Sequence, residues 1–439
     1  MILRHDDHVG HGTSNAPDEF LHQVDLASEI VDSLRLGDHP RLTHQTLRGL
    51  LGLILLHLGL LTKNPRLNQR ASRLVSVIAN PVSHGARFAE SVSSSVTSTS
   101  LSLVADIRLA DPRLVINEHF PSLAARSMFR FSSFPRLAAA WRLRRSAELR
   151  GAATENLAWL YREYLFLAQA IRYSCARELL STWPRGAVVL TDFDRAAYTR
   201  PWVWAARTCG YPLATLFHGS PNAANYLPLL AEYALLWGTA QEEWIRAHAP
   251  SATPVVVGRA DLPETTVRLN PVKRVLICHS REVLSSHETE AIVSVIARLD
   301  ARTVLRLHPT SDENGLTDGW ERIAAKADDV QVSRLSLLDE LGPHDLVICV
   351  SSSSAVEALA VGIPAIVIAD DARVLPCDLD VIRDNSAEVL EEMSQRSGHR
   401  LDGTITILSR KLVDCTGAEA SSRLDAALLT IASRSGATK

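Results

Sequence analysis

Four consecutive serines, Ser351 to Ser354, lie where an apolar run gives way to helix-forming residues. The run 346–350 has the length and β-branched content of a buried strand, and 355–361 predicts a helix that ends at Gly362. Hydroxyl and backbone N–H groups at the start of a helix favour bound phosphate. Glu357, one turn further on, could accept hydrogen bonds from sugar hydroxyls. An ordinary serine N-cap is the alternative, but four serines in a row favour a phosphate site.

A histidine-proline pair, His308-Pro309, follows a second apolar run, 303–307. An imidazole close to a phosphate donates a hydrogen bond, and as a cation it offsets the charge of a leaving group. By itself His308 would be interpreted as a residue that caps a strand end. No acidic pair nearby suggests a metal site, so we expect fixed hydrogen-bond donors to do the work of a metal.

Polar residues also follow two apolar runs in the first half of the chain. Thr191-Asp192-Phe193-Asp194 follows the run 187–190, and His218-Gly219 follows the run 213–217. A carboxylate within about 3 Å of a hydroxyl can act as a general base, and only one of Asp192 and Asp194 needs to do so. Asp192 could instead cap the next helix. His218 could serve as base or oxyanion partner, and Gly219 would let the backbone approach a ligand.

The elements that position these residues alternate between strand and helix, which indicates an α/β protein with parallel sheets. In such sheets ligands bind beyond the carboxyl ends of the strands, where the polar clusters fall. The polar, proline-bearing segment 261–271 is interpreted as a linker. We therefore predict two Rossmann-like domains that face each other across a cleft. The predicted strands are 187–190, 213–217, 233–237, 255–257, 274–278, 303–307, 330–332, 346–350 and 365–369.

The predicted domain organisation has three parts. Residues 1–260 form the acceptor-side domain, with a helix-rich region over 1–150 and a Rossmann-like region over 151–260. Within the helix-rich region, Ser91–Ser102 is expected to be a loop or an irregular strand, and Leu101–Leu109 a strand. Residues 272–386 form the nucleotide-binding donor domain. Residues 387–439 form a helical tail that could cross back onto the first domain.

Composition narrows the classes of partner and the compartment. The 439 residues carry a formal net charge of −3, which argues against nucleic acid as a partner. Six scattered cysteines without a C-x-x-C pair are typical of a reducing cytosol, and the polar N-terminus is no signal peptide. The apolar stretch 50–61 is too short to span a bilayer. Basic residues follow it, so peripheral contact with the inner face of the membrane is an alternative to a buried core helix.

A second basic segment, residues 124–150, mixes arginines with aromatic residues. It could dock an anionic acceptor or lipid headgroups, or it could be the polar face of a helix. The candidate docking residues are Arg142, Arg144 and Arg145.

The histidine-proline pair and the serine run that opens E-A-L-x-x-G-x-P, residues 357–364, together resemble a known family. They are similar to bacterial GT-B glycosyltransferases: the sialyl- and polysialyltransferases, the capsule-type Kdo transferases and the CDP-glycerol polymerases of teichoic acid synthesis. The resemblance implies that a nucleotide-activated donor is held by His308, Pro309, Ser351, Ser352, Ser353 and Ser354, with Glu357 at the ribose. His218-Gly219 resembles the H-G pair of capsule-type transferases. The acidic-acidic-glycine motif of the sialyltransferase-like members is absent, and its closest substitute is 191–194.

The resemblance implies an inverting, metal-independent glycosyltransferase that acts in the cytoplasm on a cell-envelope polysaccharide or a lipid-linked glycan. It requires no cofactor besides the donor co-substrate, in which CMP or CDP is slightly favoured over UDP. Three alternatives stay open. A CDP-glycerol-type glycerophosphotransferase would use the same cleft, and a nucleotide-sugar 2-epimerase shares the two-domain fold. The third is a catalytically inactive GT-B protein that binds a polysaccharide or partner enzymes.

Overall fold

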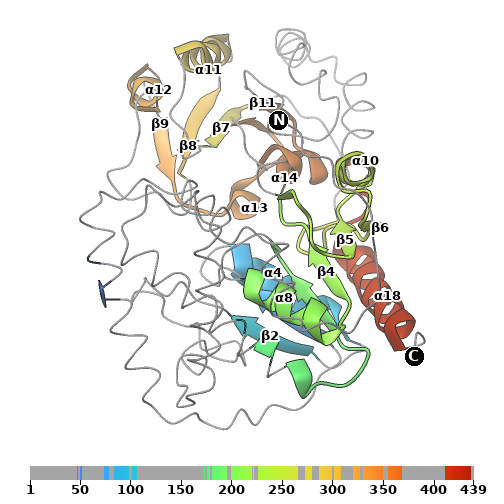
Figure 1. The fold of residues 1–439 in the computed structure, drawn as a ribbon. Helices are drawn as coiled ribbons and strands as arrows, with labels where there is room; N and C mark the ends of the chain where they lie inside the picture. Colours follow the sequence, from blue (N-terminus) through green and yellow to red (C-terminus); the bar gives the residue numbers. More distant parts are fainter. Residues whose placement is uncertain are drawn as a thin grey trace.

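The structure is a computed structural model, and it describes only part of the chain. The described residues are 47, 50–51, 74–78, 84–97, 101–105, 173, 176–177, 180–194, 199–219, 221, 226–264, 272–278, 286–298, 301–307, 320–326, 330–349, 354–367 and 411–436. These residues form two sheets of parallel strands with helices packed against them (Figure 1). The prediction of an α/β protein with two Rossmann-like domains is therefore confirmed.

The first sheet has six parallel strands in the order β2-β1-β3-β4-β5-β6. The strands are β1 (Leu74–Ile78), β2 (Leu101–Ala105), β3 (Val188–Thr191), β4 (Leu213–Leu216), β5 (Tyr233–Leu236) and β6 (Thr253–Val256). The described helices of this part are α4 (His84–Ser95), α8 (Arg200–Cys209) and α10 (Thr239–His248). Strand order reverses between β1 and β3, so β1 and β2, which come from residues 1–150, share a sheet with the strands of 151–260.

The second sheet has five parallel strands in the order β11-β10-β7-β8-β9. The strands are β7 (Arg274–Cys278), β8 (Arg302–Arg306), β9 (Val330–Ser333), β10 (Asp345–Cys349) and β11 (Ala365–Val367). The described helices are α11 (Ser286–Arg298), α12 (Trp320–Lys326), α13 (Leu337–Glu340) and α14 (Ser354–Ala360). Strand order reverses between β7 and β10. Helix α14 begins soon after the carboxyl end of β10 in the chain.

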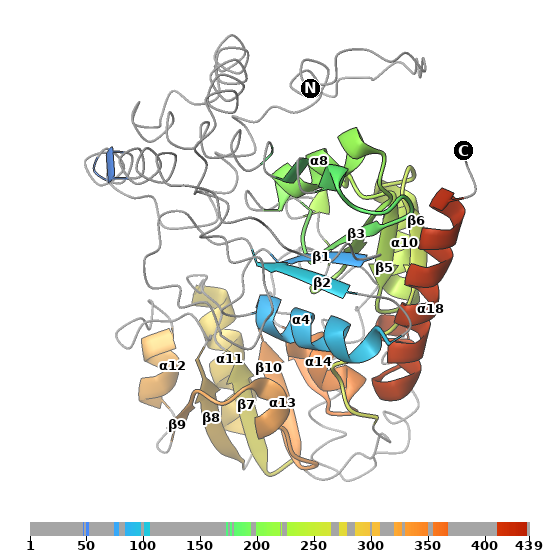
Figure 2. The same cartoon turned by 90° about the horizontal axis from the view of Figure 1, so that it is seen from below.

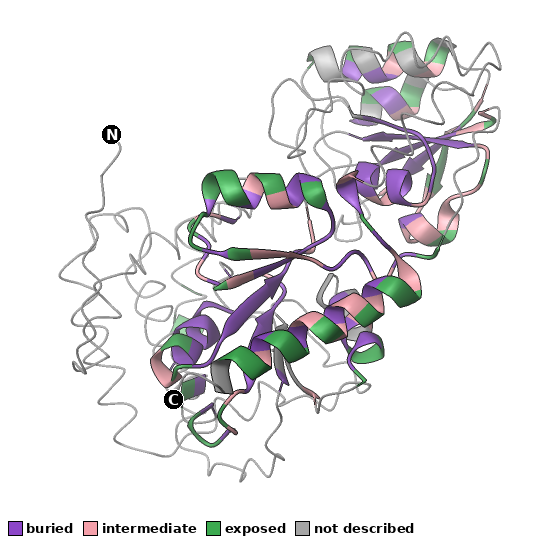
Figure 3. Ribbon diagram, turned by 90° about the vertical axis from the view of Figure 1, so that its right-hand side faces the viewer, coloured by how far each residue is buried: buried purple, intermediate pink, exposed green. Residues whose placement is uncertain are grey.

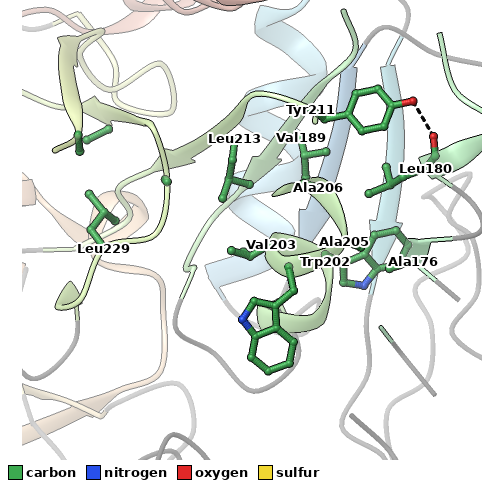
Figure 4. Close-up of a cluster of buried hydrophobic side chains, with 14 of the residues drawn as sticks. Ala176, Leu180, Val189, Trp202, Val203, Ala205, Ala206, Tyr211, Leu213 and Leu229 are labelled. Carbon is green, nitrogen blue, oxygen red and sulfur yellow. Dashed lines mark hydrogen bonds between the residues drawn. The ribbon is translucent and has the colours of Figure 1, made fainter. Parts of the chain in front are cut away.

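The strands are buried because their sequences are almost wholly apolar. All four residues of β3 and of β4, and all five of β10, are buried (Figure 3). Figure 4 shows how α8 packs on the first sheet through Trp202 and Val203. The Tyr211 hydroxyl, which follows α8, donates a hydrogen bond to the carbonyl of Leu180 at 2.7 Å. The hydroxyl of Tyr211 therefore has a hydrogen-bond partner while its ring packs in the core. This anchors the chain just before β4.

Helix α18 (Gly417–Gly436) follows the second domain in the chain but packs on the first. Leu424, Leu428 and Ile431 are buried in one cluster with residues of β1, β3, β4, β5 and α4. Figure 2 shows α18 alongside α4. The first domain is therefore built from two separate parts of the chain.

Two segments of chain run side by side between the domains. The backbone N–H of Arg259 donates to the carbonyl of Cys415 at 2.9 Å, and the N–H of Gly417 donates to that of Leu262 at 3.0 Å. Gly258 has φ of +79°, and a Cβ on it would lie 2.3 Å from the Cys415 carbonyl oxygen. Only glycine fits this conformation and this approach.

The serine-rich stretch differs from its prediction, because residues 91–95 continue helix α4. The hydroxyl of Ser95 donates to the Ser91 carbonyl at 2.6 Å and lies 3.1 Å from the Ser421 hydroxyl of α18. Serines that bond back to the preceding turn are compatible with a helix, and the buried face of α4 decides the outcome. The strand predicted over 101–109 is confirmed for Leu101–Ala105. Among the helices in the described part of the chain, we find none that is long and apolar enough to cross a bilayer.

Candidate functional site

The carboxyl ends of β7 and β10 lie at the strand-order reversal of the second sheet, where open α/β sheets bind ligands. Ser354 opens α14 at this point and is buried. Burial raises the pKa of the adjacent Cys278 thiol, whereas the charge of Arg306 and a side-chain hydrogen bond with Ser354 oppose that rise. The other predicted phosphate ligands, His308, Pro309, Ser351, Ser352 and Ser353, lie outside the described residues.

In the first domain the structure brings the ends of β3 and β4 together. Nδ1 of His218 lies 2.6 Å from the backbone carbonyl oxygen of Asp192. A carbonyl oxygen can only accept, so Nδ1 carries the proton and Nε2 of the neutral ring carries a lone pair. Burial lowers the pKa of His218 below its usual 6.5, the hydrogen bond to Asp192 opposes this, and the charge of Arg259 lowers it further. His218 is therefore a neutral base at pH 7.

Aromatic rings hold the imidazole of His218 in place. The ring of Phe193 meets it edge-on at 5.5 Å between centroids. Tyr226 stacks on Phe217 at 4.3 Å, and its hydroxyl bonds to the backbone of His218 and Gly219. A Cβ on Gly219 would lie 3.7 Å from that hydroxyl, an ordinary contact, so the described surroundings do not by themselves require glycine there.

The two predicted carboxylates differ in what they contact. Oδ2 of Asp194 accepts hydrogen bonds from the backbone N–H groups of Leu230 at 2.6 Å and Ala231 at 3.2 Å. Its side chain is fully buried, so Asp194 fixes the loop that precedes β5. Asp192 is also buried. Burial is the main cause that raises the pKa of Tyr226, and the negative charge of Asp192 raises it further. Of the three predicted bases, the described geometry favours His218.

A cavity of about 50 Å³ lies where the two domains meet. Its polar lining comes from Ser91, His218 and Arg259 of the first domain, Asp261 of the linker and Glu357 of the second domain. The apolar lining includes Phe88, Leu216, Phe217, Val257 and Leu424. One predicted base and one predicted donor ligand therefore share a cavity, although they lie 139 positions apart in the chain.

Arg259 is a polar residue of this cavity that sequence reasoning missed. Nε and Nη2 donate to the two carboxylate oxygens of Asp261, each at 2.6 Å. Nη2 also lies 3.3 Å from Oε1 of Glu357. The guanidinium carbon lies 4.3 Å from the centroid of the Trp237 ring. Burial acts to lower the pKa of Arg259, but the contacts with Asp261 and Glu357 raise it overall, so the group stays charged.

Glu357 forms an ion pair with Arg259, whereas the resemblance implies that Glu357 binds the ribose of the donor. Glu357 lies on α14, and its side chain is 13% exposed. The signal available in the sequence was the Gly258-Arg259 pair that follows β6, just before the linker. The predicted docking residues Arg142, Arg144 and Arg145 lie outside the described residues.

Comparison with known proteins identifies no family by sequence. No family model matches the chain, and no curated protein matches it. Among solved structures, the lipopolysaccharide outer core galactosyltransferase WaaB is similar with a TM-score of 0.48 and 13% identity, over 81% of this chain and 99% of that one. A glycosyltransferase from Rickettsia africae gives 0.47 and 12%, over 83% and 99%. A UGT transferase from Siraitia grosvenorii gives 0.46 and 13%, over 82% and 99%.

Proposed function

We propose that this protein is a glycosyltransferase that moves a sugar from a nucleotide-activated donor to a hydroxyl of a cell-envelope polysaccharide or glycolipid. The observation that carries the proposal is His218: a neutral imidazole, oriented by the Asp192 carbonyl, in a cavity shared with Glu357 of the second domain. The resemblance of 308–309 and 351–364 to GT-B glycosyltransferases supplies the donor side of the proposal.

In the proposed reaction, Nε2 of His218 accepts the proton of the acceptor hydroxyl. The acceptor oxygen attacks the anomeric carbon of the donor, and the bond from that carbon to the phosphate oxygen breaks. The leaving nucleotide takes the bonding electron pair. This single displacement inverts the anomeric configuration and requires no metal. His308 and Ser351–Ser354 are proposed to stabilise the negative charge on the departing phosphate.

The donor class is tested first, by thermal unfolding of the protein with CMP, CDP, UDP, GDP and dTDP at millimolar concentration. Stabilisation by one base identifies the donor, because a ligand that binds only the folded state raises its stability. Hydrolysis of the matching nucleotide sugar then separates an enzyme from a protein that only binds. Indifference to all five nucleotides would overturn the proposed function.

The base is tested by His218→Asn, whose amide can still donate to the Asp192 carbonyl but has no basic nitrogen. Loss of a general base should lower kcat by about 10²- to 10⁴-fold while the nucleotide still binds. A matched control exists in His248, an exposed histidine whose Nδ1 lies 2.9 Å from the Trp244 carbonyl oxygen. His248→Asn makes the same chemical change outside the cavity and should leave kcat unchanged.

A further inference from the structure

The two N–H groups on Nη1 of Arg259 have no hydrogen-bond acceptor among the described residues, although the atom is buried. The side chain of Arg259 is only 8% exposed, and its other donors are occupied by Asp261 and Glu357. A buried donor without an acceptor is unfavourable, because it has given up its hydrogen bonds with water. Because Arg259 also lines the cavity, the unfilled donor indicates a place that a ligand atom completes.

The charges around the cavity select the kind of ligand. Among the described residues that line it, Arg259 supplies one positive charge, and Asp261 and Glu357 supply two negative charges. A phosphate would therefore meet a net negative surrounding, which opposes it. A neutral oxygen with a lone pair can accept a hydrogen bond from Nη1. If that oxygen carries a hydrogen, its O–H group can donate a hydrogen bond to a carboxylate. A hydroxyl group has this combination.

The size of the cavity agrees with a hydroxyl-bearing ligand. A cavity of about 50 Å³ holds the equivalent of roughly three to five waters. That space is enough for the hydroxyl-bearing edge of one sugar ring. The guanidinium already covers the face of Trp237 at 4.3 Å, so recognition here depends on hydrogen bonds rather than on stacking.

The ion pair indicates which sugar is held. Nη2 of Arg259 contacts Glu357 on α14, which follows β10 at the strand-order reversal of the second sheet. The guanidinium, which Asp261 holds, is thus also in contact with the domain to which the proposed function assigns the donor. We propose that Nη1 of Arg259 donates a hydrogen bond to a hydroxyl of the sugar that is transferred. This inference rests on the proposed function and adds a specificity-determining residue to it.

The test compares the affinity for a nucleotide alone with that for the same nucleotide carrying its sugar, by titration calorimetry. The probes are UDP with UDP-glucose, UDP-galactose and UDP-N-acetylglucosamine, CMP with CMP-N-acetylneuraminate, and GDP with GDP-mannose. Arg259→Lys keeps the charge but has no second nitrogen to replace Nη1. A hydrogen bond from a charged donor corresponds to about 10- to 100-fold in affinity. Arg259→Lys should therefore weaken nucleotide-sugar binding by about that factor and leave nucleotide binding within about threefold.

The matched control is Arg246→Lys, the same change at an arginine that pairs with Glu242 on the exposed face of α10. It should leave both affinities unchanged. An equal loss for nucleotide and nucleotide sugar in Arg259→Lys would indicate a phosphate or base contact and overturn the inference. No loss for either would also overturn it. If Arg259→Lys does not fold, Arg259→Gln gives the same ratio of affinities, because its amide can still donate to Asp261.

Failure of the proposed function has a different signature. If the wild-type protein binds none of these nucleotides or nucleotide sugars, the transferase proposal fails, and the assignment of Arg259 fails with it. If the wild type binds nucleotide sugars and Arg259→Lys binds them equally well, only the assignment of Arg259 fails.

Discussion

The guanidinium of Arg259, in the segment that follows β6 of the first sheet, lies 3.3 Å from the carboxylate of Glu357 on α14 of the second domain. The two side chains are 8% and 13% exposed. The cation stays charged because Asp261 accepts hydrogen bonds from its Nε and Nη2, and Glu357 adds a second carboxylate next to Nη2. Arg259 and Glu357 therefore both join the two domains and line the candidate site.

Replacement of Glu357 by Gln should destabilise the protein, because Arg259 loses one of its two acidic partners. Hydrogen bonds to charged groups contribute about 1.5–3 kcal/mol, and we expect a decrease of that size in the free energy of unfolding. Chemical denaturation measures it. Glu242→Gln is the control, since Glu242 pairs with Arg246 on an exposed surface, where ion pairs contribute at most about 0.5 kcal/mol. Equal effects of the two substitutions would contradict the prediction.

The rate of transfer should depend on pH through His218. Because the pKa of His218 lies below 6.5, the ring stays neutral, and able to act as a base, down to pH values below 6.5. The acidic limb of the kcat/KM profile, which reports the free enzyme, should therefore have its midpoint below 6.5. A midpoint at or above 6.5 would exclude His218, as described here, as the base. The profile of His218→Asn should lose this limb.

The same histidine should make stability depend on pH. The unfolded chain binds a proton at His218 near pH 6.5, whereas the folded protein does so only at lower pH. Between these values the unfolded state holds more protons, so the free energy of unfolding falls as pH falls below 6.5. The comparison of wild type with His218→Asn by denaturant titration at pH 7.5 and 5.5 isolates this contribution. A larger fall in the variant than in the wild type would contradict it.

Asp194 should matter for stability more than for chemistry. Asp194→Ala removes two hydrogen bonds from backbone N–H groups to a buried carboxylate, each corresponding to about 1.5–3 kcal/mol. Asp194→Asn keeps an oxygen that can accept and should recover part of that stability. The kcat of folded Asp194→Asn should fall less than that of His218→Asn. The opposite order would make Asp194 the base.

Alanine substitutions at two glycines distinguish the effect of backbone strain on stability from that of close packing. Gly258 and Gly210 have φ of +79° and +70°, so alanine at either should cost about 1–2 kcal/mol from conformation alone. A Cβ on Gly258 would also collide with the Cys415 carbonyl, whereas a Cβ on Gly210 meets nothing within 4 Å. Gly258→Ala should therefore lower the unfolding free energy clearly more than Gly210→Ala. Equal effects would indicate that the segments around Gly258 and Cys415 can move apart without a loss of stability.

The strands of both sheets could be predicted because buried parallel strands are continuous apolar runs bounded by polar turns. From 187 onwards the predicted strands match β3 to β11 to within two residues at each end. Helix α4 could not be predicted through Ser95, because its helical state depends on packing against α18, more than 300 residues away. Arg259 was missed for the same physical reason. Its position depends on the segment around Cys415, and the Gly258-Arg259 pair by itself does not contain that information.

The packing of α18 has a consequence for the order in which the chain folds. During synthesis β1 to β6 leave the ribosome first, yet Leu424, Leu428 and Ile431, which cover part of that sheet, follow only after the whole second domain. Domains generally fold as units while the chain is made. Here the second domain can be complete while the first still exposes apolar surface. Nascent chains that stop before residue 417 should therefore bind chaperones through the first domain.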